Sequence, residues 1–95
     1  MTNDADANDS PGVDDTALLP RRDCLTQYAI YDHPRDHPDY FVVRPWDIVD
    51  GNVVPRTAAG LFRELDKARQ WCAQYGLVCI GRMAGDDPVI IEVWT

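Results

Sequence analysis

The sequence predicts a small α+β domain in which four strands and one helix follow one another in the order ββαββ. Two segments before residue 50 and two after residue 76 have the β-branched and aromatic composition of strands, and one segment between them has helical periodicity. Turn-forming residues separate these segments. Two hairpins that flank a single helix most simply form a four-stranded antiparallel sheet with the helix packed on one face.

The first 22 residues are predicted to form a disordered acidic tail. Residues 1–20 contain five Asp and no Lys or Arg, with little apolar character before residues 17–19. The rest of the chain holds all 9 basic and 11 of the 16 acidic side chains, so the net charge of −7 comes mainly from the tail. We therefore expect one folded domain at residues 23–95.

Two predicted strands lie before the helical segment and two lie after it. The first predicted strand, CLTQYAIYD, ends at the polar segment DHPRDHPD, and the second is YFVVRPWDIV, with Pro45 near its end. Because proline cannot donate a ladder hydrogen bond, either this strand lies at a sheet edge or Pro45 lies where pairing has stopped. LVCIGRM and PVIIEVW form the second predicted hairpin, which residues 84–87 connect.

The helix is predicted within residues 58–75. Apolar side chains recur there three and four positions apart and form one stripe: Leu61, Leu65, Ala68, Cys72 and Tyr75. Gly76 is expected to end the helix, because glycine tolerates the left-handed conformation at that position. Gly60 weakens the first turn, so the alternative is that residues 59–62 are extended and the helix begins near Arg63.

Alternation along the strands divides their side chains between two faces of the predicted sheet. Wholly apolar sets, such as Phe41 with Val43 and residues 89, 91 and 93, are expected under the helix. The opposite face then carries five polar or aromatic residues among aliphatic neighbours, and these are the predicted protein-binding residues: Arg44, Trp46, Arg82, Glu92 and Trp94.

This open face is too apolar for one that water alone covers. A solvated sheet face normally alternates cleanly with polar residues, and large exposed apolar patches usually mark interaction sites. Tryptophan beside arginine is also typical of binding hot spots. The alternatives are that Arg44 and Glu92 form a cross-strand pair under packed tryptophans, or that residues 17–19 fold back as a cover.

No residue pattern predicts catalysis, so we expect a non-enzyme with no cofactor and no small-molecule substrate. Cys72 and Cys79 are predicted to face the core, where thiols are usually inert, and nothing places a histidine beside Cys24. Asp86 and Asp87 fit a turn better than an acid–base pair. The glycines are scattered and form no phosphate-binding loop.

Two other functions remain as alternatives. Residues 32–39 contain two imidazoles and three carboxylates, a set that binds divalent metals when it converges. Pro34 and Pro38 oppose the helix that would bring the histidines together, so a solvated loop without metal ligands is predicted. Aromatic side chains on a sheet also stack single-stranded bases, but the nearly neutral body disfavours nucleic acid as a partner.

Composition further predicts a cytoplasmic protein. No apolar run approaches the roughly 20 residues of a membrane helix, and the N-terminus lacks the basic and apolar regions of a secretory signal. Three cysteines, an odd number without CxxC spacing, fit free thiols in a reducing compartment. The expected partner is another protein or a second copy of the chain, with no membrane.

The strings YDHPRDHPDYFVVRPW and DDPVIIEVW resemble segments of a group of short, uncharacterised bacterial proteins. The resemblance extends over the folded part of the chain and implies a small bacterial accessory protein. It brings no reaction, cofactor or catalytic residue with it. The sequence thus favours a non-enzymatic binding module or accessory protein, including a regulatory or anti-defence protein of a mobile element, that uses the sheet face opposite the helix.

Overall fold

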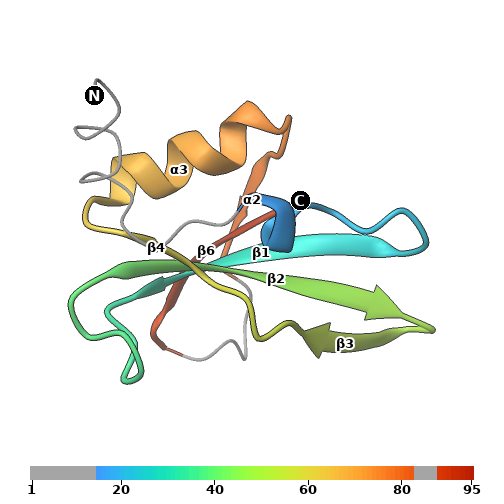
Figure 1. Cartoon of the computed structure of the whole chain (residues 1–95), viewed down its shortest axis with the longest axis horizontal. Coiled ribbons are helices and arrows are strands. Elements are labelled where there is room, and N and C mark those ends of the chain that lie inside the picture. The colour runs from blue at the N-terminus through green and yellow to red at the C-terminus, as the bar shows by residue number, and fades with distance from the viewer. Residues whose placement is uncertain (1–14, 83–87) are drawn as a thin grey trace.

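A computed structural model describes residues 15–82 and 88–95 as an antiparallel sheet with one main helix across one face (Figure 1). Its strands, within those residues, are β1 (Leu25–Asp32), β2 (Phe41–Val49), β3 (Asn52–Pro55), β4 (Gly60–Phe62), β5 (Cys79–Gly81) and β6 (Ile90–Trp94). Its helices are α2 (Asp15–Leu18) and α3 (Leu65–Gln74). The strands run in the order β3-β2-β1-β6-β5 across the sheet, and β4 also pairs with β2.

The predicted α+β class is confirmed, but the four-stranded sheet and the ββαββ order are wrong. β3 and β4 precede the helix and lie beside β2, on the side away from β1. Both pair with β2, through Trp46 opposite Pro55 and Val43 opposite Gly60. They are therefore two short segments of one edge strand that is interrupted at residues 56–59. Segments this short, interrupted by proline and glycine, give only a weak strand signal.

Pro45 lies inside β2, because the strand continues past it to Val49. The Pro45 carbonyl accepts a hydrogen bond from the Arg56 backbone N–H at 3.0 Å. In an antiparallel strand the N–H and C=O of one residue point to the same side, so the N–H that proline lacks would point to where β3 has just ended. Proline is tolerated here because it interrupts pairing only at the gap between β3 and β4.

The helix begins later than the start of its predicted range. Residues 60–62 form β4, as the alternative with an extended segment predicted, and α3 follows at Leu65. Its buried side chains are Ala68, Trp71 and Cys72, so Trp71 joins the predicted stripe. Gly76 has a φ of 77° immediately beyond the helix, as expected for a glycine that ends it.

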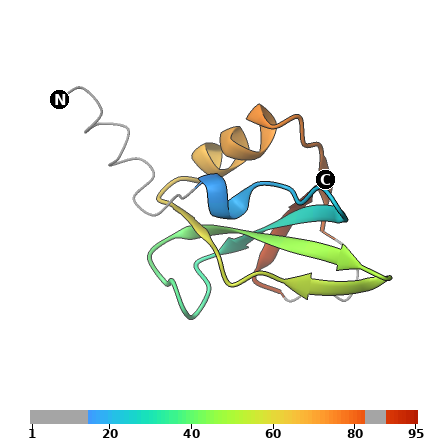
Figure 2. The same cartoon turned by 45° about the vertical axis from the view of Figure 1, so that its right-hand side comes forward.

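The main core lies between α3 and the sheet and also contains a residue from the N-terminal segment. Its buried members are Leu18, Tyr28, Ile30, Val43, Phe62, Ala68, Trp71 and Cys72. α2 lies on the same side of the sheet as α3 (Figure 2), and its Leu18 is fully buried. The Leu18 Cδ1 lies 3.0 Å from the position that a Cβ on Gly60 would occupy, so only glycine allows this close approach without displacement.

We expected the folded domain to begin at residue 23, whereas the described fold already includes α2 at Asp15. Residues 1–14 of the predicted tail and the predicted connection at 84–87 lie outside the described residues. Among the helices that are described, none has the length and apolarity needed to cross a membrane.

Candidate binding surface

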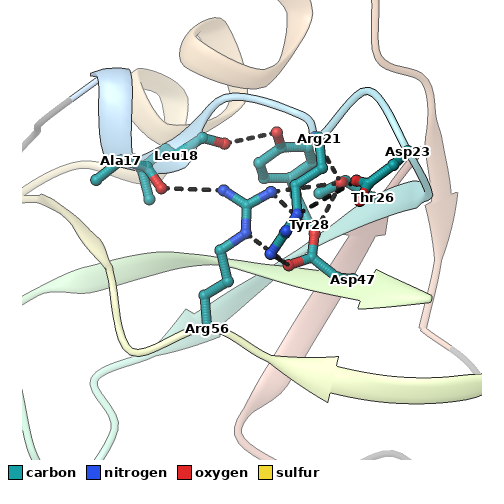
Figure 3. Close-up of polar contacts among 8 residues, drawn as sticks. All are labelled: Ala17, Leu18, Arg21, Asp23, Thr26, Tyr28, Asp47 and Arg56. Atoms are coloured by element: carbon teal, nitrogen blue, oxygen red, sulfur yellow. Dashed lines mark hydrogen bonds and ion pairs between the residues drawn. The ribbon is translucent and has the colours of Figure 1, made fainter. Parts of the chain in front are cut away.

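A cluster of polar side chains joins the N-terminal segment to the sheet (Figure 3). Asp47 on β2 is only 2% exposed and accepts two hydrogen bonds from the Arg56 guanidinium, from Nε at 2.8 Å and from Nη2 at 2.9 Å. The Thr26 hydroxyl donates to the same carboxylate at 2.9 Å. These hydrogen bonds from Arg56 hold the pKa of Asp47 below its ordinary value, although burial acts in the opposite direction.

The same cluster holds the backbone of α2. Nη1 of Arg56 donates to the Ala17 carbonyl at 3.0 Å, and the Tyr28 hydroxyl donates to the Leu18 carbonyl at 2.6 Å. Burial raises the pKa of Tyr28 to about 12, so the hydroxyl stays a donor at neutral pH. No buried side-chain polar atom in the described residues lacks a partner. The cluster is therefore a structural tether for α2.

In the loop at residues 32–39, the two histidines contact different aspartates. His33 Nδ1 is hydrogen-bonded to Asp32, whereas His37 Nε2 lies 3.9 Å from Asp36 Oδ2. Asp36 in turn accepts a hydrogen bond from Arg44 at 3.1 Å. Across residues 15–82 and 88–95, no group of three His, Cys, Asp or Glu side chains is placed to hold a metal ion.

The five predicted binding residues do not share one face. Arg44 pairs with Ala29 on β1, and Trp46 pairs with Gln27, which places both on the face opposite α3. Trp94 pairs with Tyr28, a core residue under the helix, and therefore lies on the helix side. Arg82 follows β5, and its Nε donates to the Ile90 carbonyl at 3.1 Å.

A β-bulge in β6 explains this correction. Ile30 pairs with Glu92 but Tyr31 pairs with Ile90, so Ile91 is an extra residue between the two pairs. The bulge reverses the alternation after Ile90 and sends Glu92 to the helix side. Val93, which was expected under the helix, is instead buried on the opposite face with Ala29.

Glu92 and Trp94 therefore help to anchor the helix. Arg69 on α3 donates from Nε at 2.9 Å and from Nη2 to Glu92 Oε2, and Trp94 Nε1 donates to Glu92 Oε1 at 3.1 Å. Burial raises the pKa of Glu92, but the hydrogen bonds from Arg69 and Trp94 outweigh it and leave the pKa below its ordinary value. The alternative cross-strand pair between Arg44 and Glu92 is excluded, because the two lie on opposite faces.

Cys72 and Cys79 were both expected to face the core, but only Cys72 does so. Cys72 is buried, as expected, and burial raises the pKa of its thiol to about 12. Cys79 pairs with Trp94 on the outermost strand β5, but its side chain is exposed and not in the core. Cys24 is half-buried, and all three thiols are free.

Pairing register arranges the open-face residues in rows that cross the strands. The outermost row is wholly apolar and contains Leu25 on β1, Ile48 on β2 and Val53 on β3. Leu25 is 57% exposed and Val53 is 53% exposed. The next row contains Gln27, Trp46 and Pro55.

Further along the same face, Trp46 and Tyr31 cover a buried apolar floor. The floor consists of Ala29, Ile90 and Val93. Trp46 Nε1 donates to the Tyr31 hydroxyl at 3.2 Å, and the Arg44 guanidinium lies 5.9 Å from the centre of the Tyr31 ring. We define the open-face patch as Leu25, Ile48, Val53, Pro55, Trp46 and Arg44.

Four members of the open-face patch were not among the residues predicted from the sequence, namely Leu25, Ile48, Val53 and Pro55. Ile48 lies two residues after Trp46 within the predicted strand YFVVRPWDIV, so the same alternation places it on the open face. Val53 had no such signal, because the pairing of β3 with β2 places it there.

Comparisons with protein-family models, with curated proteins and with solved structures gave no match.

Proposed function

We propose that this chain is a non-enzymatic protein-binding module and that the open-face patch is its docking surface. The observation that carries the proposal is the apolar row of Leu25, Ile48 and Val53 beside Trp46. Antiparallel sheets that face water usually alternate apolar with polar side chains, but this row offers no polar side chain at all. An accessory or regulatory role in a bacterial cell is consistent with the resemblance of the sequence.

The chemistry of the patch suits a protein partner. Leu25 and Val53 each leave about half of the side chain in water, so covering each of them contributes on the order of 1 kcal/mol. Trp46 and Arg44 beside them are the residue types that dominate binding hot spots. Arg44 is already oriented by Asp36 at 3.1 Å and by the Tyr31 ring, so little side-chain freedom is lost on binding.

Two aspartate substitutions test the proposal with matched exposure. Leu25→Asp places a charge in the open-face patch, where Leu25 is 57% exposed, whereas Val78→Asp places one just before β5, near the other edge of the sheet, where Val78 is 63% exposed. Neither residue belongs to the buried core, so both variants should fold with an unchanged circular dichroism spectrum.

The measurement is affinity capture from bacterial extract, followed by titration calorimetry with each purified partner. Leu25→Asp should weaken binding at least about tenfold, and Val78→Asp should leave affinity within about twofold. Equal affinity of the wild type and the Leu25→Asp variant for every captured protein would refute the open-face patch as the docking surface.

A further inference from the structure

The free edge of the sheet at β3 has a backbone geometry that fits a second copy of itself. Asp50 and Gly51 have φ of 51° and 80° and connect β2 to β3 in a two-residue turn. Such a turn is closed by a hydrogen-bonded pair, here Val49 with Asn52. Because successive residues of a strand point their N–H and C=O groups to opposite sides, those of Asn52 and Val54 point toward β2 and those of Val53 point away from it. The hydrogen bond from the Arg56 N–H to the Pro45 carbonyl on β2 agrees with this alternation, because Arg56 lies two residues after Val54.

Four of the eight exposed large apolar side chains among the described residues lie near this edge. Every residue of β3 is exposed, and four exposed large apolar side chains lie on the β2–β3 hairpin and the adjoining start of β1: Leu25, Val49, Val53 and Val54. They occupy both faces of the sheet, since Val53 pairs with Ile48 on the open face and Val54 pairs with Asp47 on the helix side. An added strand would cover this hairpin from the edge and shield both faces.

We propose that two copies of the chain pair their β3 strands antiparallel about a two-fold axis at Val53. In this register Val53 of each copy donates its N–H to the Val53 carbonyl of the other, which gives two symmetric hydrogen bonds. The apolar row of Leu25, Ile48 and Val53 continues across the axis into the same row of the second copy. Neighbouring strands lie about 4.8 Å apart, so the two Val53 side chains touch.

Charge also favours this register. Residues 50–56 contain only two charged side chains, Asp50 and Arg56. The Arg56 guanidinium is already paired with Asp47, so it does not face the second copy. Antiparallel pairing centred on Val53 places the two Asp50 side chains at opposite ends of the shared ladder, whereas a parallel arrangement in register would place them side by side.

Pro55 limits the pairing to a closed dimer. Its carbonyl points outward like that of Val53, but it has no N–H to donate, so the ladder stops there. The two-fold axis uses the same edge of both copies and leaves no β3 edge for a third. A pairing of four residues is small, so we expect a weak dimer with a dissociation constant on the order of 10–100 µM.

This inference rests on the open-face patch of the proposed function, but it names a partner and a register of its own. Val53→Pro removes the outward N–H and replaces the isopropyl group with the proline ring, at an edge position where proline is tolerated and where the ladder to β2 does not use that donor. Val53→Thr keeps the N–H and the β-branched shape and is the matched control. Ile80→Asp places a charge at the other edge of the sheet, on β5, where Ile80 is also exposed.

Sedimentation equilibrium and concentration-dependent amide exchange test the proposal on the full chain, at concentrations up to about 1 mM. The wild type, the Val53→Thr variant and the Ile80→Asp variant should dimerise alike, and in each of them the backbone amide at position 53 should gain protection as concentration rises. Val53→Pro should weaken dimerisation at least about tenfold while its thermal melt at low concentration stays cooperative.

A monomeric wild type at every concentration would overturn the dimer, and so would a dimer that Val53→Pro leaves intact. Loss of cooperative melting in Val53→Pro would be resolved with Val53→Asp, which must also dissociate the dimer for the inference to stand. A monomeric wild type whose protein partners are nevertheless lost in Leu25→Asp would overturn the dimer alone and leave the proposed function in place.

Discussion

Replacing Arg56 with methionine removes the partner of a carboxylate that has almost no contact with water. The Asp47 side chain is 3% exposed, and its two shortest contacts with a cation are the Arg56 hydrogen bonds at 2.8 and 2.9 Å. Removing one member of a buried ion pair costs about 3–5 kcal/mol, because the other charge stays buried and uncompensated. Asp47 keeps the Thr26 hydrogen bond and Arg21 at 4.0 Å, so we expect the lower end, about 3 kcal/mol.

A loss of this size is large for a domain of 95 residues. Such domains are stable by roughly 5–10 kcal/mol, and 1 kcal/mol shifts the melting temperature by roughly 4–8 °C. Arg56→Met should therefore lower the melting temperature by about 12–24 °C. Urea unfolding followed by tryptophan fluorescence measures the free energy of unfolding, with the buried Trp71 among the reporting residues.

The double variant Asp47→Leu with Arg56→Met separates the unpaired charge from the lost tether. Both variants lose the Arg56 contact with the Ala17 carbonyl, but only the single variant leaves a buried carboxylate without its guanidinium. The double variant should be more stable than Arg56→Met alone by at least about 1 kcal/mol. Arg35→Met, at an exposed loop position, is the control and should change stability by less than about 0.5 kcal/mol.

Two results would refute this reasoning. One is a cost of less than about 1 kcal/mol for Arg56→Met, because it would mean that the ion pair contributes little to the fold. The other is a double variant no more stable than the single one, because the cost would then come from lost packing or the lost tether and not from the unpaired carboxylate.

Three further predictions concern acid stability, thiol reactivity and the β2–β3 turn. Because the folded-state pKa of Asp47 lies below its ordinary value of 3.8, the ionised carboxylate stabilises the fold above about pH 4 and this contribution is lost as the pH falls further. Urea titrations between about pH 3 and pH 6 should therefore show a smaller pH dependence in Asp47→Asn than in the wild type, and equal slopes would contradict the assignment. In a Cys24→Ser background, a thiol reagent should modify Cys79 at once and Cys72 only on unfolding, since the pKa of Cys72 is raised to about 12 by burial; simultaneous labelling of both would show that the helix face is open. Gly51→Ala should destabilise the fold by about 1 kcal/mol, because a Cβ is strained at a φ of 80° although no atom lies near it, and an unchanged free energy of unfolding would argue against this turn geometry.

Local pattern was enough to predict the elements whose signals lie within a few neighbouring residues. The strand compositions of β1 and β2 indicated both strands, and Gly76 marked the end of the helix. Alternation also placed Arg44 and Trp46 on the open face, because side chains two apart in an unbroken strand must point the same way. These features depend on backbone geometry over one or two turns of chain, which the sequence carries directly.

Pairing between distant segments decided the rest. The bulge at Ile91 moves Glu92 and Trp94 to the helix side, and it is visible only when β6 is set against β1. β3 and β4 are too short to be recognised alone and become strands because β2 pairs with both. Leu18 lies in a segment whose composition predicts a tail, yet it is buried over Gly60 and tethered through Arg56 and Tyr28.

The physical reason for this division is the range of each interaction. The sequence by itself determined the fold class, the main helix and the alternation within strands, because these follow from local backbone preference and side-chain periodicity. Only the tertiary structure decided which face each residue of β6 occupies and that α2 joins the core. Both depend on hydrogen bonds and burial between residues that are far apart in the chain, and local periodicity does not encode those contacts.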